Sequence, residues 1–259
     1  MIHKIFLRIC IALCTAFANS ATHADASSLG FGVSKLTYRE PSLDVTHEAW
    51  LPTLQGQWTP DDWQVGDWPI SLVGQIAKGD ADYKGTGTMD HQPMSLYQLQ
   101  IQSAHAEWVD GYQITPGLGY RQLYNDARGL TSTGAQGYRR TSEYWYASLG
   151  IEQSLSDDWR WMGQLYYLLA GKQTTRLGDV SGDVGKLGTV ENAQHRGYGF
   201  QLGFCKVLDS FDVCPSFEMW RVADSDTRSQ RVNGQTYLLT EPMNTTKTFQ
   251  VLVHYPFKD

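Results

Sequence analysis

Four residues have side chains and positions from which a hydrolytic site could be assembled. Asp80 and Asp82 form a carboxylate pair near the start of a polar stretch, while His195 and Asp224 lie beside two later apolar segments. A carboxylate pair and a His oriented by an Asp can activate a water molecule for hydrolysis. Acids in polar stretches are more often simply solvated, so these four residues are only weak candidates for catalysis.

Cys205 and Cys214 are the only cysteines after residue 24, and they are symmetric about Asp209 and Ser210. If Asp209 and Ser210 form a hairpin turn, the cysteines face each other on neighbouring strands, at a separation that a disulfide tolerates. We therefore expect a structural disulfide, with two free buried thiols as the alternative. A metal site is not expected, because no third and fourth ligand lies nearby.

Charged residues recur on the polar side of segments whose other side is apolar: Arg121, Glu152, Arg160 and Glu218. Charges that are removed from water need partners. Glu152 and Arg160 flank one short turn and should pair across it. We interpret the four as a structural charge network that fills an interior.

These residues would be positioned by strands, of which the last is the clearest. Apolar side chains take every second position at the end of the chain: Phe249, Val251, Val253, Tyr255 and Phe257. Successive residues of a strand point to opposite faces, so these five form one apolar face. A face this long is useful against lipid when the opposite face lines a polar lumen. We expect the closing strand of a transmembrane β-barrel.

Nine earlier segments show the same alternation. The ten predicted strands cover about residues 29–40, 50–58, 68–76, 97–102, 112–121, 144–152, 159–169, 198–205, 213–220 and 248–257. The predicted fold is therefore all-β: a single antiparallel transmembrane β-barrel of ten strands. Eight or twelve strands, and a soluble β-fold, are the alternatives.

The predicted connections alternate in length. Those after the second, fourth, sixth and eighth strands are short, whereas long loops are expected at residues 78–93, 125–140, 171–194 and 223–247. An even-stranded barrel with both termini in the periplasm has short periplasmic turns and long extracellular loops.

The first residues have the composition of a secretory signal. Lys4 and Arg8 precede an apolar run and small residues, which predicts a signal peptide at residues 1–24 and a barrel domain at residues 25–259. Loss of residues 1–24 would change the net charge from −6 to −8, with 19 basic and 27 acidic residues left. Such a negative chain is not expected to bind nucleic acid, and no cofactor is expected.

The chain resembles the small outer-membrane β-barrel proteins of Gram-negative bacteria, the porin-like and OmpA-like barrels, most clearly over residues 200–257. The features that carry the resemblance are Trp220, Asp224-Ser225-Asp226, Glu241-Pro242, Asn244-Thr245-Thr246 and Tyr255-x-Phe257. The last resembles the C-terminal insertion signal of that family, although Lys258 and Asp259 follow where the family usually stops. The resemblance implies location in the outer membrane, with lipid, lipopolysaccharide and the barrel-assembly machinery as partners.

The resemblance leaves activity open. The rim candidates loosely resemble those of the omptin proteases, but the Asp-x-His spacing of that family is absent. The His-x-Ser pair of the lipid A deacylases is absent too. We therefore expect a non-enzymatic surface-interaction or envelope-structural protein, whose loops meet an extracellular ligand of unknown kind. A lipid A-modifying or protease-like enzyme at the rim and a narrow channel are the alternatives.

Overall fold

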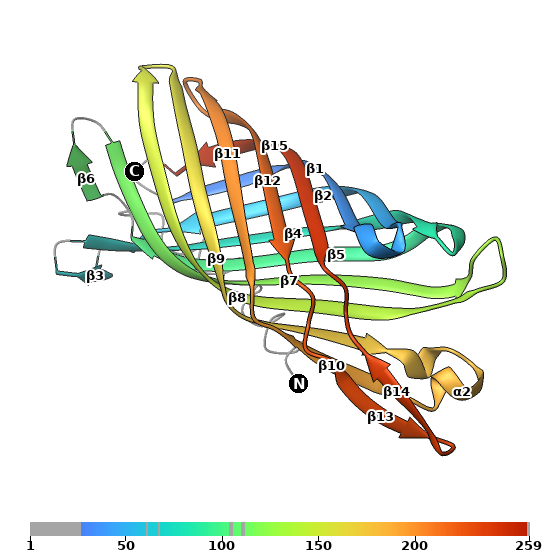
Figure 1. Ribbon diagram of the computed structural model, residues 1–259. Coiled ribbons are helices and arrows are strands. Elements are labelled where there is room, and N and C mark those ends of the chain that lie inside the picture. The colour runs from blue at the N-terminus through green and yellow to red at the C-terminus, as the bar shows by residue number, and fades with distance from the viewer. Residues whose placement is uncertain (1–26, 61, 67, 104–105, 110–111, 258–259) are drawn as a thin grey trace.

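The computed structural model describes residues 27–60, 62–66, 68–103, 106–109 and 112–257. One antiparallel sheet closes into a barrel, because the last strand pairs with the first, and a two-stranded hairpin forms a separate small sheet (Figure 1). The predicted all-β barrel of ten strands is confirmed. The predicted signal peptide, its cleavage site, and Lys258 and Asp259 lie outside the described residues.

The strands that close the barrel are, in order around it, β1 (Ser28–Glu40), β2 (Val45–Trp58), β4 (Trp68–Gly85), β5 (Gly87–Ser103), β7 (Tyr112–Leu130), β8 (Gln136–Ser156), β9 (Trp159–Arg176), β11 (Gly197–Val207), β12 (Asp212–Val222) and β15 (Asn244–Pro256). Smaller elements join them: η1 (Pro41–Leu43), β3 (Gln64–Val65), β6 (Ala106–Val109), η2 (Leu177–Asp179), α2 (Gly182–Gly185), β10 (Thr189–Gln194), β13 (Arg228–Val232) and β14 (Gln235–Leu239). None of the helices in this part of the chain is long and apolar enough to cross a membrane.

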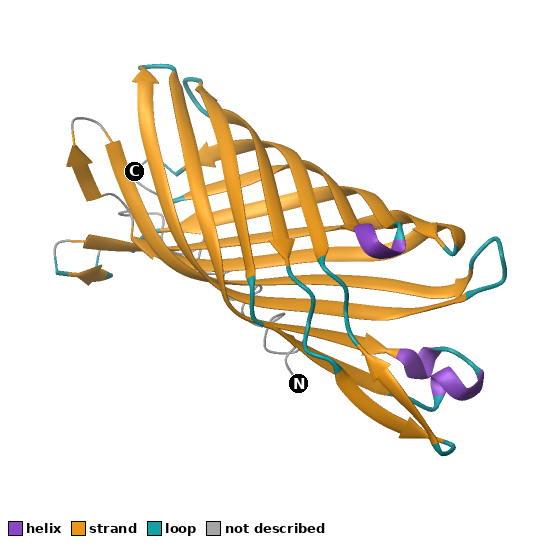
Figure 2. Cartoon of the chain, in the orientation of Figure 1, coloured by secondary structure: helices purple, strands orange, loops and turns teal. Residues whose placement is uncertain are grey.

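The two ends of the barrel differ in their connections (Figure 2). At one end, which we call the turn end, lie Ser27, Phe257 and the short turns β8–β9 and β11–β12. At the other, the hairpin end, the predicted loops at residues 78–93 and 125–140 are wrong: most of both ranges is paired strand, belonging to β4 and β5 and to β7 and β8. Residues 177–196 and 223–243 are longer connections, and they carry α2, β10 and the β13–β14 hairpin.

A band of large apolar side chains, the apolar belt, surrounds the barrel between these ends. Phe31, Leu118, Leu165 and Phe249 belong to four different strands, and each is at least half exposed on the outer surface. The closing strand has the predicted orientation, since Phe249, Tyr255 and Phe257 are exposed while Gln250 and Leu252 are buried in the lumen.

Towards the hairpin end, apolar side chains become common on the inward face of the strands, and polar side chains on the outward face. Trp50 is 62% exposed on the outer wall, whereas the next residue, Leu51, is fully buried inside. On β1, Lys35 faces outward and Leu36 inward. Beyond this level the barrel has polar side chains outside and a hydrophobic core inside, formed by Leu36, Tyr38, Ala49, Leu51, Ala77, Ala81, Met94, Leu96 and Leu123. The expected polar lumen fills the turn-end part, whereas at the hairpin end buried polar side chains such as Gln173 and Glu241 lie beside this hydrophobic core.

Candidate functional site in the barrel lumen

A layer of large side chains closes the lumen at mid-height. This middle layer consists of Arg121, Tyr144, Tyr146, Tyr166, Glu218 and Trp220. Trp220 is 1% exposed, and its ring centroid lies 4.9 Å from that of Tyr166 and 5.2 Å from that of Tyr146. A Cβ at Gly199 would come within 2.9 Å of the Trp220 ring, so glycine at this position lets the ring lie against β11.

Arg121 and Glu218, two of the predicted lumen charges, are brought together in the middle layer. The Arg121 Nε lies 3.9 Å from the Glu218 Oε1, and the guanidinium carbon lies 5.7 Å from the centre of the Trp220 ring. Gln98 donates a hydrogen bond of 3.1 Å to Glu218. Arg121 is fully buried, and none of its three guanidinium nitrogens makes a hydrogen bond.

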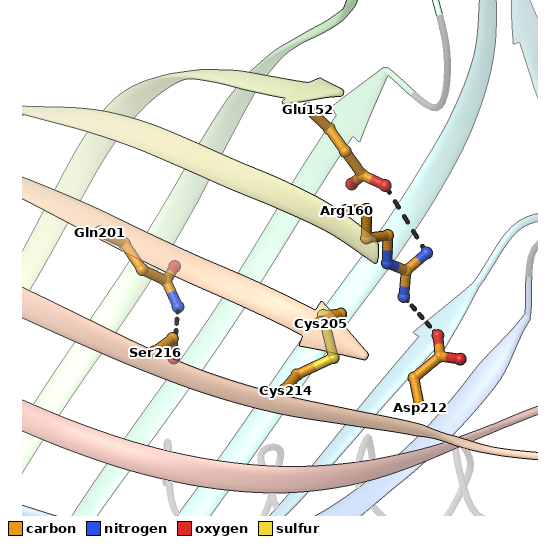
Figure 3. The surroundings of a disulfide bond; sticks show 7 residues. All are labelled: Glu152, Arg160, Gln201, Cys205, Asp212, Cys214 and Ser216. Carbon is orange, nitrogen blue, oxygen red and sulfur yellow. Dashed lines mark hydrogen bonds and ion pairs between the residues drawn. A yellow bond between two sulfur atoms is a disulfide. The ribbon is translucent and has the colours of Figure 1, made fainter. Parts of the chain in front are cut away.

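The other two predicted charges form a separate network at the turn end (Figure 3). Arg160 lies between Glu152, at 3.6 Å, and Asp212, at 2.6 Å. The pairing of Glu152 with Arg160 is as predicted, whereas Asp212 was not foreseen. A cavity of about 310 Å³ lies here, and glutamine is the commonest residue type in its lining.

The disulfide lies on the same side of the lumen. Cys205 and Cys214 are bonded, with Cα atoms 4.2 Å apart, and both point into the barrel near Arg160 (Figure 3). The neighbouring pairs Gly203–Ser216 and Lys206–Val213 keep one register on either side, so the cysteines lie directly opposite each other.

A second cavity, of about 360 Å³, lies on the other side of the middle layer, at the hairpin end. We call it the outer cavity. Its wall is built by the ends of β1, β2, β4, β5, β7 and β8, where the barrel interior is apolar. No described residue lines both cavities. The lumen is therefore two compartments separated by the middle layer.

The polar groups of the outer cavity are concentrated around Arg140. Its guanidinium pairs with Glu40 and receives further contacts from the Tyr138 hydroxyl at 3.0 Å and Glu241 at 3.8 Å. The His47 imidazole lies 3.4 Å from the Asn125 side chain. Sequence reasoning missed all six residues as members of a site, because Glu40 and His47 were assigned to the first strand and its connection, and the others to loops.

The rim candidates for catalysis do not converge. Asp80 and Asp82 point outward from β4, whereas His195 and Asp224 flank β11 and β12 across the barrel. His195 is paired with Asp226, at 3.2 Å, and Asp224 accepts a hydrogen bond from the Met243 backbone. This arrangement does not place a carboxylate pair and a His around one water molecule. Within the described ranges, no three His, Cys, Asp or Glu side chains are grouped to hold a metal ion.

No protein-family model and no curated protein matches the sequence. Solved structures with a similar fold include the attachment invasion locus protein Ail of Yersinia pestis, with 10% identity over 88% of this chain and 96% of that chain and a TM-score of 0.34. The toluene transporter TodX of Pseudomonas putida has 9% identity over 92% of this chain and 91% of its own, with a TM-score of 0.34. A FadL homologue of Pseudomonas aeruginosa has 9% identity over 90% of each chain, with a TM-score of 0.31. The barrel fold of this chain rests on its own strand pairing, in which β15 closes on β1.

Proposed function

We propose that this chain is an integral protein of the bacterial outer membrane, that it does not conduct, and that it acts at the cell surface through its hairpin end. The observation that carries the proposal is the inversion of polarity along the strands. An outer wall of exposed Trp, Phe and Leu is stable against lipid, whereas a polar wall around an apolar interior is stable in water. The hairpin end thus projects from the bilayer as a folded extension.

The orientation follows from the chain ends. In bacterial barrels of even strand number the termini and short turns are periplasmic. Here Ser27 and Phe257 lie at the turn end, where the Phe257 N–H donates to the Ser27 carbonyl at 2.9 Å. The hairpin end then faces the medium, and β15 with its outward Phe249, Tyr255 and Phe257 is the segment that the barrel-assembly machinery would recognise.

Lysines next to aromatic rings support contact with anionic outer-membrane lipid. The Lys35 ammonium lies 5.8 Å from the centre of the Trp50 ring, and the Lys78 ammonium lies 5.4 Å from that of Tyr97, both at the edge of the apolar belt. Aromatic rings prefer the headgroup level, and lysines there attract phosphates. We propose lipopolysaccharide as the lipid partner at this level.

A surface-interaction role fits the hairpin end better than either alternative. The middle layer opposes a channel, because Arg121, Tyr144 and Trp220 are nearly inaccessible and separate the two cavities. The scattered positions of Asp80, Asp82 and His195 oppose a hydrolase. What the hairpin end offers instead is a rigid extension of paired strands with a cavity at its mouth.

Two measurements test the proposal. A short epitope inserted between Asn233 and Gly234 should be bound by antibody on intact cells, whereas one inserted between Asp157 and Asp158 should be bound only after the outer membrane is opened. The purified protein in planar bilayers should give no discrete current steps, and Trp220→Ala should introduce them. Labelling of the second epitope on intact cells would mean that the protein has the opposite orientation. Discrete current steps from the unaltered protein would mean that it is a channel.

A further inference from the structure

The outer cavity has the size and access of a ligand site. Its volume of about 360 Å³ equals that of about a dozen water molecules in the liquid. Exposed residues, Leu43, Thr86 and Gln136, stand at its mouth, so it opens to the medium at the hairpin end. Its inner part is lined by the buried side chains of Met94 and Leu123, and Leu123 lies two residues from Arg121 of the middle layer on β7. A molecule can therefore enter from one side only, and it would be bound in the cavity rather than transported through the barrel.

Most of the wall is apolar and adaptable. Met94 and Leu123 are 3% and 5% exposed, and Met89 lies nearer the mouth. Tyr38, His47 and Tyr83 form a row of rings, with centroids 5.8 Å and 5.1 Å apart. Aromatic rings offer faces and edges to another ring, and methionine adjusts to irregular shapes. The body of a ligand would be a hydrocarbon, and an aromatic ring fits best.

One polar side chain in this wall is incompletely hydrogen-bonded. Gln92 is 2% exposed and approaches the His47 imidazole, but neither its Nε2 nor its Oε1 makes a hydrogen bond of good geometry. A buried carboxamide without partners costs about 1–3 kcal/mol for each unsatisfied group. Two further atoms that line the cavity are also unpartnered, the Glu40 Oε2 and the Arg140 Nε. A ligand that carries both a donor and an acceptor would satisfy this wall.

The charges around the cavity favour a neutral ligand. Arg140 is the cation of the wall, and it already pairs with Glu40 and Glu241. The three side chains together carry one negative charge, so an anionic ligand would meet no free positive charge. A carboxamide prefers a partner with the same donor and acceptor pattern, which an amide provides.

We propose that the outer cavity binds a small neutral molecule of about ten non-hydrogen atoms, with an aromatic or similarly apolar body and an amide-type end that pairs with Gln92. This site is independent of the membrane orientation, because it depends on the fold of the hairpin end alone. Failure of the epitope or conductance test would leave it standing, and failure of the binding test would leave the surface location standing.

The test uses phenylacetamide as the probe, with phenylacetate and propylbenzene as analogues that change only the polar end. Ligand-observed NMR on the full chain in detergent micelles, referenced to empty micelles, should give a dissociation constant for the amide of about 1 mM or tighter. Phenylacetate should bind at least about tenfold more weakly, because it loses a donor and brings a charge to a wall that is already negative.

Variants distinguish the site from general partitioning into micelles. Gln92→Leu should weaken binding of the amide about tenfold, the loss expected for one or two hydrogen bonds, and leave propylbenzene unchanged. It removes an unsatisfied polar group, so folding should be preserved. Leu123→Trp fills the cavity and should abolish binding of both. Its matched control is Leu118→Trp on the outward face of the same strand, where Leu118 is 62% exposed, and binding should be unaffected.

Two results would overturn the proposal. One is a dissociation constant for phenylacetamide weaker than about 1 mM. The other is equal affinity of the unaltered protein and Gln92→Leu for the amide.

Discussion

Arg121 and Glu218 lie 3.9 Å apart in the lumen, although their strands do not adjoin. Three strands separate β7 from β12 in one direction around the barrel and five in the other. The ion pair therefore connects nearly opposite walls, with the Trp220 ring beside it. Both charges are almost completely removed from water, and a network this buried is costly to break on one side.

Removal of one partner should destabilise the barrel strongly. Arg121→Met leaves the Glu218 carboxylate buried beside neutral partners such as Gln98, and we expect a loss of about 3–5 kcal/mol in the free energy of unfolding. Glu218→Gln leaves a buried guanidinium and should have a similar effect. The double variant should recover most of the loss, as measured by denaturant unfolding in lipid vesicles. Additive losses in the double variant would mean that the two residues are not coupled.

The sequence identified these charges but not the pair across the barrel. Glu152 and Arg160 flank one turn, so their contact follows from local geometry. The contact of Arg121 with Glu218 depends on the diameter and closure of the barrel, which alternation does not define. The sequence therefore predicted the ion pair whose two residues are close in the chain, and missed the one whose residues are far apart.

The two hairpins at the hairpin end were missed for a different reason. Apolar and polar residues still alternate there, but the polar residues face outward, as on β4, where Asp80 and Asp82 are exposed and Ala81 is buried inside. A search for apolar residues on the outer face ends at such a point and assigns a loop. The Asn233-Gly234 turn between β13 and β14, with φ values of 50° and 82°, was a further local hairpin signal.

The disulfide should contribute measurably to stability. Cys205 and Cys214 are 9 residues apart in sequence, and closing a loop of this length stabilises a fold by about 2–3 kcal/mol. We expect the variant with both cysteines changed to Ser to unfold at a lower denaturant concentration, with a free energy of unfolding that is lower by that amount. The unaltered protein treated with reductant should behave in the same way. Mass spectrometry without reduction should find the two peptides linked, and free thiols would contradict the structure.

The connection at η2 should loosen in acid. The hydrogen bonds from the Arg139 side chain and backbone hold the pKa of Asp179 at about 2, below its ordinary 3.8. A carboxyl group with a lowered folded-state pKa stabilises the fold fully above its unfolded pKa, and this stability is lost as the pH falls through the folded pKa. Pepsin cleavage near Leu177 should therefore rise between about pH 4 and pH 2, relative to an unstructured peptide.

Asp179→Asn is the matched variant for this effect. It removes the ionisable group but keeps the shape, so cleavage near Leu177 should already be fast at pH 4 and should not rise further in acid. A steep acid dependence in Asp179→Asn would assign the loosening to another group, such as Asp126, whose pKa is also lowered by an arginine, Arg128.

Two exposed leucines provide a direct comparison of the belt with the hairpin end. Leu165 on β9 is 63% exposed in the middle of the apolar belt, and Leu238 on β14 is 73% exposed beyond it. In lipid vesicles, Leu165→Arg should lower the free energy of unfolding by about 2–4 kcal/mol, because it places a charge near the centre of the bilayer. Leu238→Arg should change it by about 0.5 kcal/mol or less, because that side chain is already in water. Equal losses in the two variants would mean that the belt does not face lipid.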